Sequence, residues 1–282
     1  MNAPVVMPPK GDTLGHLFAV RKPIIGVVHL AALPGAPRYD GTPVRDIYAR
    51  GAADAKTLAA GGVDGIMVEN AGDMPFSRPE DIGMETVACL TSACEEIRAA
   101  VDTPIGITCV ANGAIPGLAV AKAVGARWVR VNQWANAYVA NEGFLNGAAP
   151  RALRYRAAIG AADVKILADV HVKFGAHAIT ADRTIAEQAT DAEWFDADVL
   201  IATGQRTGSP TRPEEVEQVR AGTHLPVIVG SGLDPEQVPT LMAVADGAIV
   251  GQWLKKDSVW WNPVDAERVD RLMTAVRKAR NA

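Results

Sequence analysis

Short apolar runs of strand length recur along the whole chain, and a segment of helical character follows each run. Many residues in these runs are β-branched, as is typical of strands that are buried in a parallel sheet. We interpret as strands residues 24–29, 65–69, 105–110, 127–132, 164–170, 199–202, 227–230 and 247–251. We interpret as helices the alanine-rich segments 44–60, 84–100, 114–124, 151–162, 184–193, 213–220, 235–244 and 264–280.

Strict alternation of strands and helices predicts a parallel sheet, which is either an open doubly wound sheet or a closed barrel. The count of eight units and the absence of a Gly-x-Gly-x-x-Gly motif after the first strand favour a single (β/α)8 TIM barrel. The length of 282 residues suits one barrel, and no Ser-, Gly- or Pro-rich linker divides the chain. We therefore expect residues 23–282 to form the barrel. Residues 1–22 form an N-terminal extension that covers the barrel bottom or a partner.

Several predicted helix ends carry recognisable capping residues. Asp182 is placed to cap the helix over residues 184–193, and Pro213 and Pro235 occupy first-turn positions of later helices. Gly61 and Gly125 end the first and third helices.

Composition excludes two classes of protein and suggests a compartment. The net charge is −4 and no cluster of Lys and Arg forms a basic face, which argues against nucleic-acid binding. The three cysteines have no CxxC spacing and are interpreted as free, small buried side chains in a reducing compartment. The N-terminal ten residues contain neither a secretory signal nor a membrane span, so a cytoplasmic protein is expected.

Polar residues gather where the predicted strands end, which in this fold is the rim that carries function. Alternation along residues 164–171 places Leu167, Asp169 and His171 on one face, so we expect Asp169 and His171 to point into the barrel mouth together. The same reasoning directs Val129 and Val131 outward and Arg130 and Asn132 inward. The rim residues selected in this way are His29, Glu69, Asn70, Arg130, Asn132, Asp169, His171, Lys173, Thr203 and Gly204.

Two kinds of chemistry suit this set. His29, Glu69, Asp169 and His171 are all potential ligands of a divalent metal, although their spacing is not a dedicated metal motif. Alternatively they perform general acid–base catalysis. Lys173 would form a Schiff base if it were desolvated, but its position beyond the strand end favours a solvated or substrate-anchoring lysine.

The remaining rim residues are assigned to substrate binding. Arg130, Asn132 and Asn70 would orient the substrate, with Thr203 and Gly204 beside them. The loop over residues 203–210 is rich in glycine and small hydroxyl side chains, and it is interpreted either as a lid or as an ordinary polar loop.

The loops after the seventh and eighth strands resemble a phosphate site. Gly230, Ser231 and Gly232 precede a predicted helix, and Gly251 and Gln252 follow the last strand. Glycines allow backbone N–H groups to approach an anion, and a helix N-terminus adds its dipole. Many barrel enzymes bind phosphate here, although the glycines would also serve tight turns alone.

Four segments, residues 23–37, 65–75, 168–173 and 230–233, together resemble the BtpA/SgcQ family from Pro23 to the C-terminus. The resemblance implies a TIM barrel related to phosphate-binding barrels. Some members are named photosystem I biogenesis proteins, and others are encoded beside sugar- or nucleoside-processing genes. The matched positions include His29, Glu69, Asn70, Asp169, His171 and Lys173.

The leading hypothesis is an enzyme acting on a small phosphorylated sugar or nucleotide-like compound. Isomerisation, aldol-type cleavage and glycosidic hydrolysis all fit acid–base or metal-assisted chemistry at the rim. The alternatives are a non-catalytic assembly or stability factor and a ligand-sensing barrel. A homo-oligomer is also expected: Trp253, Trp260 and Trp261 are interpreted either as core and rim packing or as packing at the barrel bottom or a subunit contact.

Overall fold

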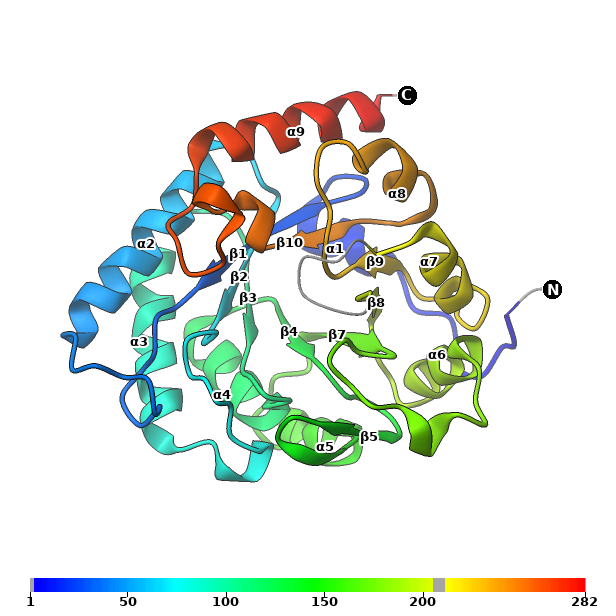
Figure 1. Ribbon diagram of the computed structural model, residues 1–282. Coiled ribbons are helices and arrows are strands. Elements are labelled where there is room, and N and C mark those ends of the chain that lie inside the picture. Colours follow the sequence, from blue (N-terminus) through cyan, green and yellow to red (C-terminus); the bar gives the residue numbers. More distant parts are fainter. Residues whose placement is uncertain (1–2, 205–210, 282) are drawn as a thin grey trace.

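The strands of the computed structural model, which describes residues 3–204 and 211–281, form a parallel barrel. Within this part of the chain eight strands close into a ring in the order β1-β2-β3-β4-β7-β8-β9-β10, with β10 pairing back to β1 (Figure 1). The predicted TIM barrel is therefore confirmed. The strands are β1 (Ile24–His29), β2 (Gly65–Glu69), β3 (Ile105–Thr108), β4 (Trp128–Val131), β7 (Lys165–Val170), β8 (Val199–Ala202), β9 (Val227–Val229) and β10 (Ala248–Val250).

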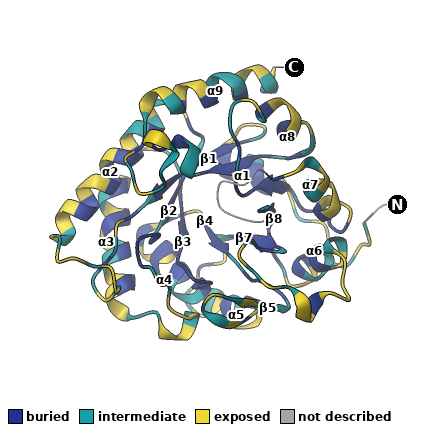
Figure 2. Cartoon of the chain, in the orientation of Figure 1, coloured by how far each residue is buried: buried dark blue, intermediate teal, exposed yellow. Residues whose placement is uncertain are grey.

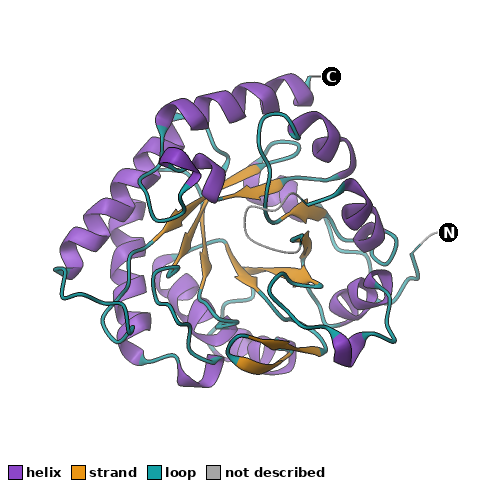
Figure 3. Cartoon of the chain, viewed as in Figure 1, coloured by secondary structure: helices purple, strands orange, loops and turns teal. Residues whose placement is uncertain are grey.

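Helices form the outer layer around this barrel, as Figure 3 shows. Their bounds agree with the sequence pattern to within one residue except at α5, which lies earlier than expected, and at α8 and α9, which begin three and two residues later than expected. No described helix is long and apolar enough to cross a membrane. The helices are α1 (Thr13–Phe18), α2 (Val44–Ala60), α3 (Met84–Ala100), α4 (Ala114–Val124), α5 (Ala149–Ala158), α6 (Ile185–Trp194), α7 (Pro213–Arg220), α8 (Val238–Val244) and α9 (Ala266–Arg280), with short 3-10 turns η1 (Pro79–Asp81), η2 (Ala178–Thr180), η3 (Gln252–Leu254) and η4 (Lys256–Ser258).

The start of α6 corrects one capping prediction. Thr184, and not Asp182, is the N-cap: its hydroxyl accepts the Glu187 backbone N–H at 3.1 Å, and the Glu187 carboxylate accepts the Thr184 N–H at 2.7 Å. This reciprocal capping box needs an acidic residue three positions after the cap, and Glu187 stands at that position relative to Thr184. Gly61 and Gly125 end α2 and α4 as expected, and Gly125 takes a left-handed φ of 66°.

A β-hairpin that the sequence pattern did not reveal is inserted between β4 and α5. Its strands β5 (Ala137–Ala140) and β6 (Gly143–Asn146) pair antiparallel across a two-residue turn, and Gly143 has a φ of 99°. The hairpin lies outside the barrel sheet (Figure 3). Its backbone pairs once more through Val139 and Ala176, so it ties down the loop that follows β7.

Buried residues fall into two main groups, one between the sheet and the helices and one inside the barrel. Figure 2 shows that the barrel strands consist largely of buried residues. Val129 and Val131 belong to the outer group, as the alternation predicted. The inner group fills the N-terminal half of the barrel. It contains Leu14, Leu17, Phe18, Ile25, Val27, Met67, Trp128, Leu167, Val199, Ile201, Ile228 and Ile249.

Helix α1 covers the N-terminal mouth of the barrel, because three of its apolar side chains enter the inner group. Phe18 packs edge-on against Trp128 with ring centroids 5.1 Å apart. Trp128 in turn lies against the backbone of β3: a Cβ on Gly106 would approach its indole to 2.1 Å. This end of the barrel is thus filled with aromatic and aliphatic side chains.

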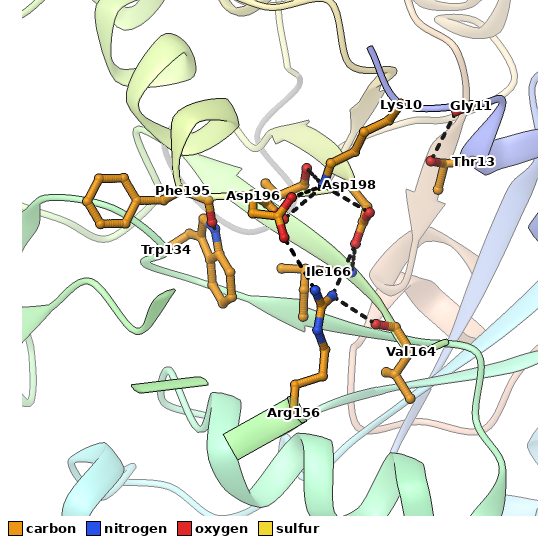
Figure 4. Close-up of polar contacts among 11 residues, drawn as sticks. Lys10, Gly11, Thr13, Trp134, Arg156, Val164, Ile166, Phe195, Asp196 and Asp198 are labelled. Atoms are coloured by element: carbon orange, nitrogen blue, oxygen red, sulfur yellow. Dashed lines mark hydrogen bonds and ion pairs between the residues drawn. The ribbon is translucent and has the colours of Figure 1, made fainter. Parts of the chain in front are cut away.

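The segment before α1 is fixed by a cluster of charged side chains, drawn in Figure 4. Lys10 forms ion pairs with Asp196 at 2.7 Å and Asp198 at 3.1 Å, and it donates a hydrogen bond to the Ala197 carbonyl. Arg156 approaches the same two carboxylates at 3.4 and 3.6 Å. The cluster holds the N-terminal segment against the turn that leads into β8.

Candidate functional site at the C-terminal rim

The barrel interior changes from apolar to polar towards the C-terminal ends of the strands. Register places His29, Glu69, Thr108 and Arg130 at one level across β1 to β4. One step below them, the inward residues are the apolar Val27, Met67 and Trp128 of the inner core group. Burial of a charged residue in the apolar half would carry a large desolvation cost, so the ionisable groups concentrate at the open end.

A cavity of about 500 Å³ opens at this end. Five sequence-predicted residues do not line it: Asn70, Asp169, His171, Thr203 and Gly204. The predicted residues that do line it are His29, Glu69, Arg130, Asn132, Lys173, Gly230, Ser231, Gly232, Gly251 and Gln252.

Asp169 lies beneath the cavity floor, where it anchors two of the lining side chains. Its carboxylate accepts two hydrogen bonds from Arg130, at 2.9 and 3.1 Å, and a third from the Asn132 amide at 3.2 Å. The side chains of this ion pair are almost fully buried. Because both carboxylate oxygens are occupied, Asp169 positions Arg130. The Nη1 group of Arg130 donates to no described acceptor and remains available to a ligand.

Glu69 projects from the end of β2 as a second carboxylate, in a different setting. Burial raises the pKa of Glu69, while the positive charges of Arg130 and Lys173 lower it. No described residue forms a hydrogen bond or ion pair with its carboxylate. A carboxyl group with a raised pKa and free oxygens is suited to exchange protons with a ligand.

His29 is held in one tautomer at the end of β1. Its Nδ1 lies 3.1 Å from the Trp260 carbonyl, an acceptor, so Nδ1 carries the proton and Nε2 is an acceptor. Burial, with the charges of Lys255 and Lys173, lowers the pKa of His29 to about 3. The imidazole is therefore neutral, and it offers Nε2 as a hydrogen-bond acceptor.

Lys173 is half-buried and lines the cavity from the loop after β7, and its expected role as a solvated or substrate-anchoring lysine stays a prediction. Its backbone N–H donates to the Thr203 hydroxyl at 3.0 Å, which fixes the loop to the end of β8. Burial and the neighbouring Arg130 charge lower the pKa of Lys173 to about 8. The loop folds back over the barrel mouth, and this path cannot be read from strand periodicity.

His171 does not enter the barrel mouth with Asp169, which corrects the alternation argument. Strand β7 ends at Val170, and His171 takes a left-handed φ of 51° that turns its side chain away. Its ring stacks on His177 at 3.9 Å, and His177 stacks on Tyr138 of the hairpin at 5.6 Å. The alternation of side chains holds only while the backbone stays extended.

Asn70 is also placed differently from expectation, because it joins loops instead of facing the cavity. Its amide donates to Asp73 at 2.8 Å and its carbonyl oxygen accepts the Val110 N–H at 2.9 Å. Asp73 accepts the Leu33 N–H at 2.8 Å. These bonds connect the loops after β1, β2 and β3, so Asn70 supports the rim from below.

The four side chains expected to share a metal do not converge. Asp169 is occupied by Arg130, and His171 faces the hairpin side. Across residues 3–204 and 211–281 there is no group of three or more His, Cys, Asp or Glu side chains that could hold a metal ion. The donor set therefore does not fit the metal site that the sequence suggested.

In the two glycine loops, after β9 and β10, the backbone lies close to the side chains of Arg130 and His29. A Cβ on Gly230 would lie 3.2 Å from Arg130 Nη2, and one on Gly251 would lie 3.1 Å from His29 Nε2. The N–H groups of Ser231 and Gly232 have no acceptor among the described residues. The helix expected from Pro235 begins three residues later, at Val238, so its N-terminus lies farther from Gly232 than predicted.

Several lining residues were missed by sequence reasoning. Tyr138 comes from the hairpin, whose only sequence signal was a two-residue turn before Gly143. Trp253 and Trp260 line the cavity from the loop after β10, so they pack at the rim and not at the barrel bottom. Trp261 is 61% exposed. The predicted lid over residues 203–210 lies largely outside the described residues, which omit 205–210.

A closed (β/α)8 barrel with an ionisable cavity at its C-terminal rim defines a TIM-barrel protein. The chain belongs to the BtpA family, whose family model matches residues 20–278. The photosystem I biogenesis protein BtpA of Synechocystis is 36% identical over 93% of this chain and 91% of its own length. An uncharacterised protein of Pyrococcus furiosus is 37% identical over 90% of this chain and 94% of its own length.

Solved structures share the fold at low sequence identity. Tryptophan synthase of Mycobacterium tuberculosis aligns with a TM-score of 0.62 at 18% identity, covering 95% of this chain and 99% of the other. N-(5'-phosphoribosyl)anthranilate isomerase of Pyrococcus furiosus gives a TM-score of 0.55 at 14% identity, covering 93% and 100%. At such identities the likeness establishes the barrel alone.

Proposed function

We propose that the protein is an enzyme that binds a small phosphorylated sugar or nucleotide-like compound and transforms it by acid–base chemistry. The observation that carries the proposal is the composition of the cavity. The backbone N–H groups of Ser231 and Gly232, which have no acceptor among the described residues, lie in one loop with Gly230, where an added Cβ would come within 3.2 Å of Arg130 Nη2. Glu69, His29 and Lys173 line the same cavity.

The phosphate would occupy the glycine loops. An anion there receives backbone N–H groups from Ser231 and Gly232, and Arg130 adds a charge-assisted donor through Nη1. Arg130 is suited to this because Asp169 fixes its guanidinium in place, so no reorganisation is needed on binding.

The reacting part of the substrate would face the ionisable wall. Glu69, whose pKa is raised by burial, exchanges a proton, and His29 Nε2 accepts a hydrogen bond from a substrate hydroxyl. This arrangement supports isomerisation or carbon–carbon cleavage. It does not support a glycosidase pair, because Asp169 is engaged by Arg130 and cannot serve as the second carboxylate.

A second candidate function is assembly or stabilisation of a partner protein, favoured by the name of the Synechocystis relative. Three exposed apolar side chains lie on the hairpin and the neighbouring loop: Val139, Phe144 and Phe174. This function would need that surface and would leave the rim ionisable groups without a role.

Ligand-dependent thermal unfolding tests the proposal. Phosphorylated sugars and nucleotides are compared with their unphosphorylated counterparts, and a ligand at about 100 times its Kd should add about 2.7 kcal/mol. We expect at least one phosphorylated compound to raise Tm by several degrees while its counterpart does not. If none of the phosphorylated compounds acts, the enzyme proposal fails and partner binding is favoured.

The Gly230→Ala variant tests the phosphate position. The new Cβ would lie 2.4 Å from Ile201 Cγ2 and 3.2 Å from Arg130 Nη2, so stability should fall by about 1–3 kcal/mol and the ligand-induced Tm shift should disappear. Gly117→Ala is the matched control, because its Cβ would meet nothing closer than 3.8 Å. If ligand still raises the Tm of Gly230→Ala as much as that of the wild type, the phosphate does not bind at this loop.

A further inference from the structure

The half-buried Lys173 differs from Lys255, a fully buried lysine of the barrel. Lys255 is fully buried and forms an ion pair with Asp54 at 2.9 Å, so its charge is neutralised within the fold. Lys173 forms no ion pair with any described carboxylate, and residues 205–210 contain no Asp or Glu. Its amino group faces the cavity. The fold thus carries the desolvation cost of a lysine that it does not pair.

The surroundings of Lys173 favour its neutral form. Arg130 is held beside it by Asp169, and burial acts in the same direction as the Arg130 charge, lowering the pKa of Lys173 to about 8. Glu69 and Asp169 oppose this effect, and His29 is neutral. At pH 7 roughly a tenth of the Lys173 side chains are unprotonated, a neutral fraction about three-hundredfold larger than that of an ordinary lysine.

We propose that Lys173 is a covalent catalytic residue, which condenses with the carbonyl carbon of a phosphorylated aldose or ketose to form an imine. The proposal rests on the phosphorylated substrate proposed above and narrows it to carbonyl compounds. A desolvated lysine beside a second cation is a known arrangement for imine chemistry. The glycine loops and Lys173 line one cavity of about 500 Å³, which can hold a short sugar phosphate.

Lys173 and Glu69 can supply every proton transfer that imine formation requires. Neutral Nζ attacks the carbonyl carbon, a C–N bond forms, and the oxygen takes up the Nζ proton to give a carbinolamine. Protonated Glu69 then donates a proton to that hydroxyl, which departs as water while the C=N bond forms. The product is a cationic iminium on Lys173 facing the Glu69 carboxylate. The iminium withdraws electrons from the adjacent carbon, which is what isomerisation and aldol-type cleavage require.

Reductive trapping tests the proposal on the full chain. The protein is incubated separately with D-glyceraldehyde 3-phosphate, dihydroxyacetone phosphate and ribose 5-phosphate, then treated with sodium borohydride, which converts an imine into a stable secondary amine. Peptide mass spectrometry locates the adduct. We expect at least one probe to modify Lys173 about tenfold more than the exposed Lys56, with the extent increasing as pH rises towards 8. Glycerol 3-phosphate, which has no carbonyl, should suppress labelling without being trapped.

Variants of Lys173 and ligand-induced Tm shifts distinguish imine formation from binding of the phosphorylated ligand. Lys173→Arg keeps the positive charge and should abolish the adduct while ligand-induced Tm shifts persist; Lys56→Arg is the control and should behave as wild type. Labelling that is no greater at Lys173 than at Lys56 with all three probes overturns the imine. If phosphorylated compounds still shift Tm in that case, the proposed function survives; if none does, both fail. Mapping on the wild-type protein decides the question even if Lys173→Arg does not fold.

Discussion

At the scale of single residues, the environment of an ionisable side chain determines its chemistry more than its identity does. Asp169 and Glu69 are both carboxylates at the rim, yet Asp169 accepts three hydrogen bonds from neighbouring side chains and Glu69 accepts none among the described residues. The first is an anchor for Arg130 and the second is a candidate acid. Lys255 and Lys173 differ in the same way, since only Lys255 has an internal carboxylate partner.

His29 provides a pH-dependent prediction at this scale. Its folded-state pKa of about 3 lies below the unfolded value of 6.5. As pH falls through this window the unfolded state binds a proton that the folded state does not, so folding stability decreases. His29→Gln should remove this dependence, with a slope difference of at most about 1.4 kcal/mol per pH unit. Urea unfolding between pH 7 and 5 measures it.

The control for this measurement is His16→Gln, which replaces an exposed histidine of α1. It should keep the wild-type dependence of stability on pH. Equal slopes in wild type and His29→Gln would show that His29 is not the buried neutral group that the Trp260 contact indicates.

At the scale of elements, the β5–β6 hairpin and the loop after β7 shape the rim together. Val139 pairs with Ala176, and Tyr138 stacks on His177, so the hairpin holds the loop that carries Lys173. The loop is fixed on its other side by the Thr203 hydroxyl. The position of Lys173 therefore depends on contacts from two elements that are distant in sequence.

The capping box of α6 gives a prediction at this scale. Thr184→Ala removes the hydroxyl that accepts the Glu187 N–H and should lower the free energy of unfolding by about 1 kcal/mol. Asp182→Ala should change it by less than about 0.5 kcal/mol, because Asp182 caps nothing. Equilibrium denaturation of both variants distinguishes the two caps, and a larger loss in Asp182→Ala would contradict the assignment.

At the scale of the whole molecule, the two ends of the barrel have separate tasks. The N-terminal end is filled by aromatic and aliphatic side chains and covered by α1, and the C-terminal end is left hollow and polar. The apolar core below the cavity stabilises the folded state through burial of hydrophobic surface. This stabilisation offsets the desolvation cost of the ionisable side chains at the C-terminal end.

Phe18→Ala tests this division. Phe18 is 8% exposed and packs on Trp128, so truncation should cost about 3–5 kcal/mol of stability. Val20→Ala, at a side chain 37% exposed, should cost less than about 0.5 kcal/mol. Thermal unfolding of each variant with and without ligand should show that the ligand-induced shift is retained in both. Loss of that shift in Phe18→Ala would mean that the two ends are coupled.

The sequence by itself determined the barrel, the strand positions and the inward direction of Arg130 and Asn132. The reason is that side-chain alternation and helix punctuation are local properties, and both persist wherever the backbone is regular. Glu69 and the glycine loops were found in the same way, because they lie at or directly after the ends of strands.

Only the tertiary structure decided which rim residues share the cavity. His171 turned away at a left-handed residue, Asn70 was taken by Asp73 and Val110, and the Lys173 loop folded inward over the mouth. Beyond the last hydrogen bond of a strand, side-chain direction depends on contacts with distant elements such as the hairpin and the β8 end. Those contacts have no sequence period, so they became visible only once the chain was folded.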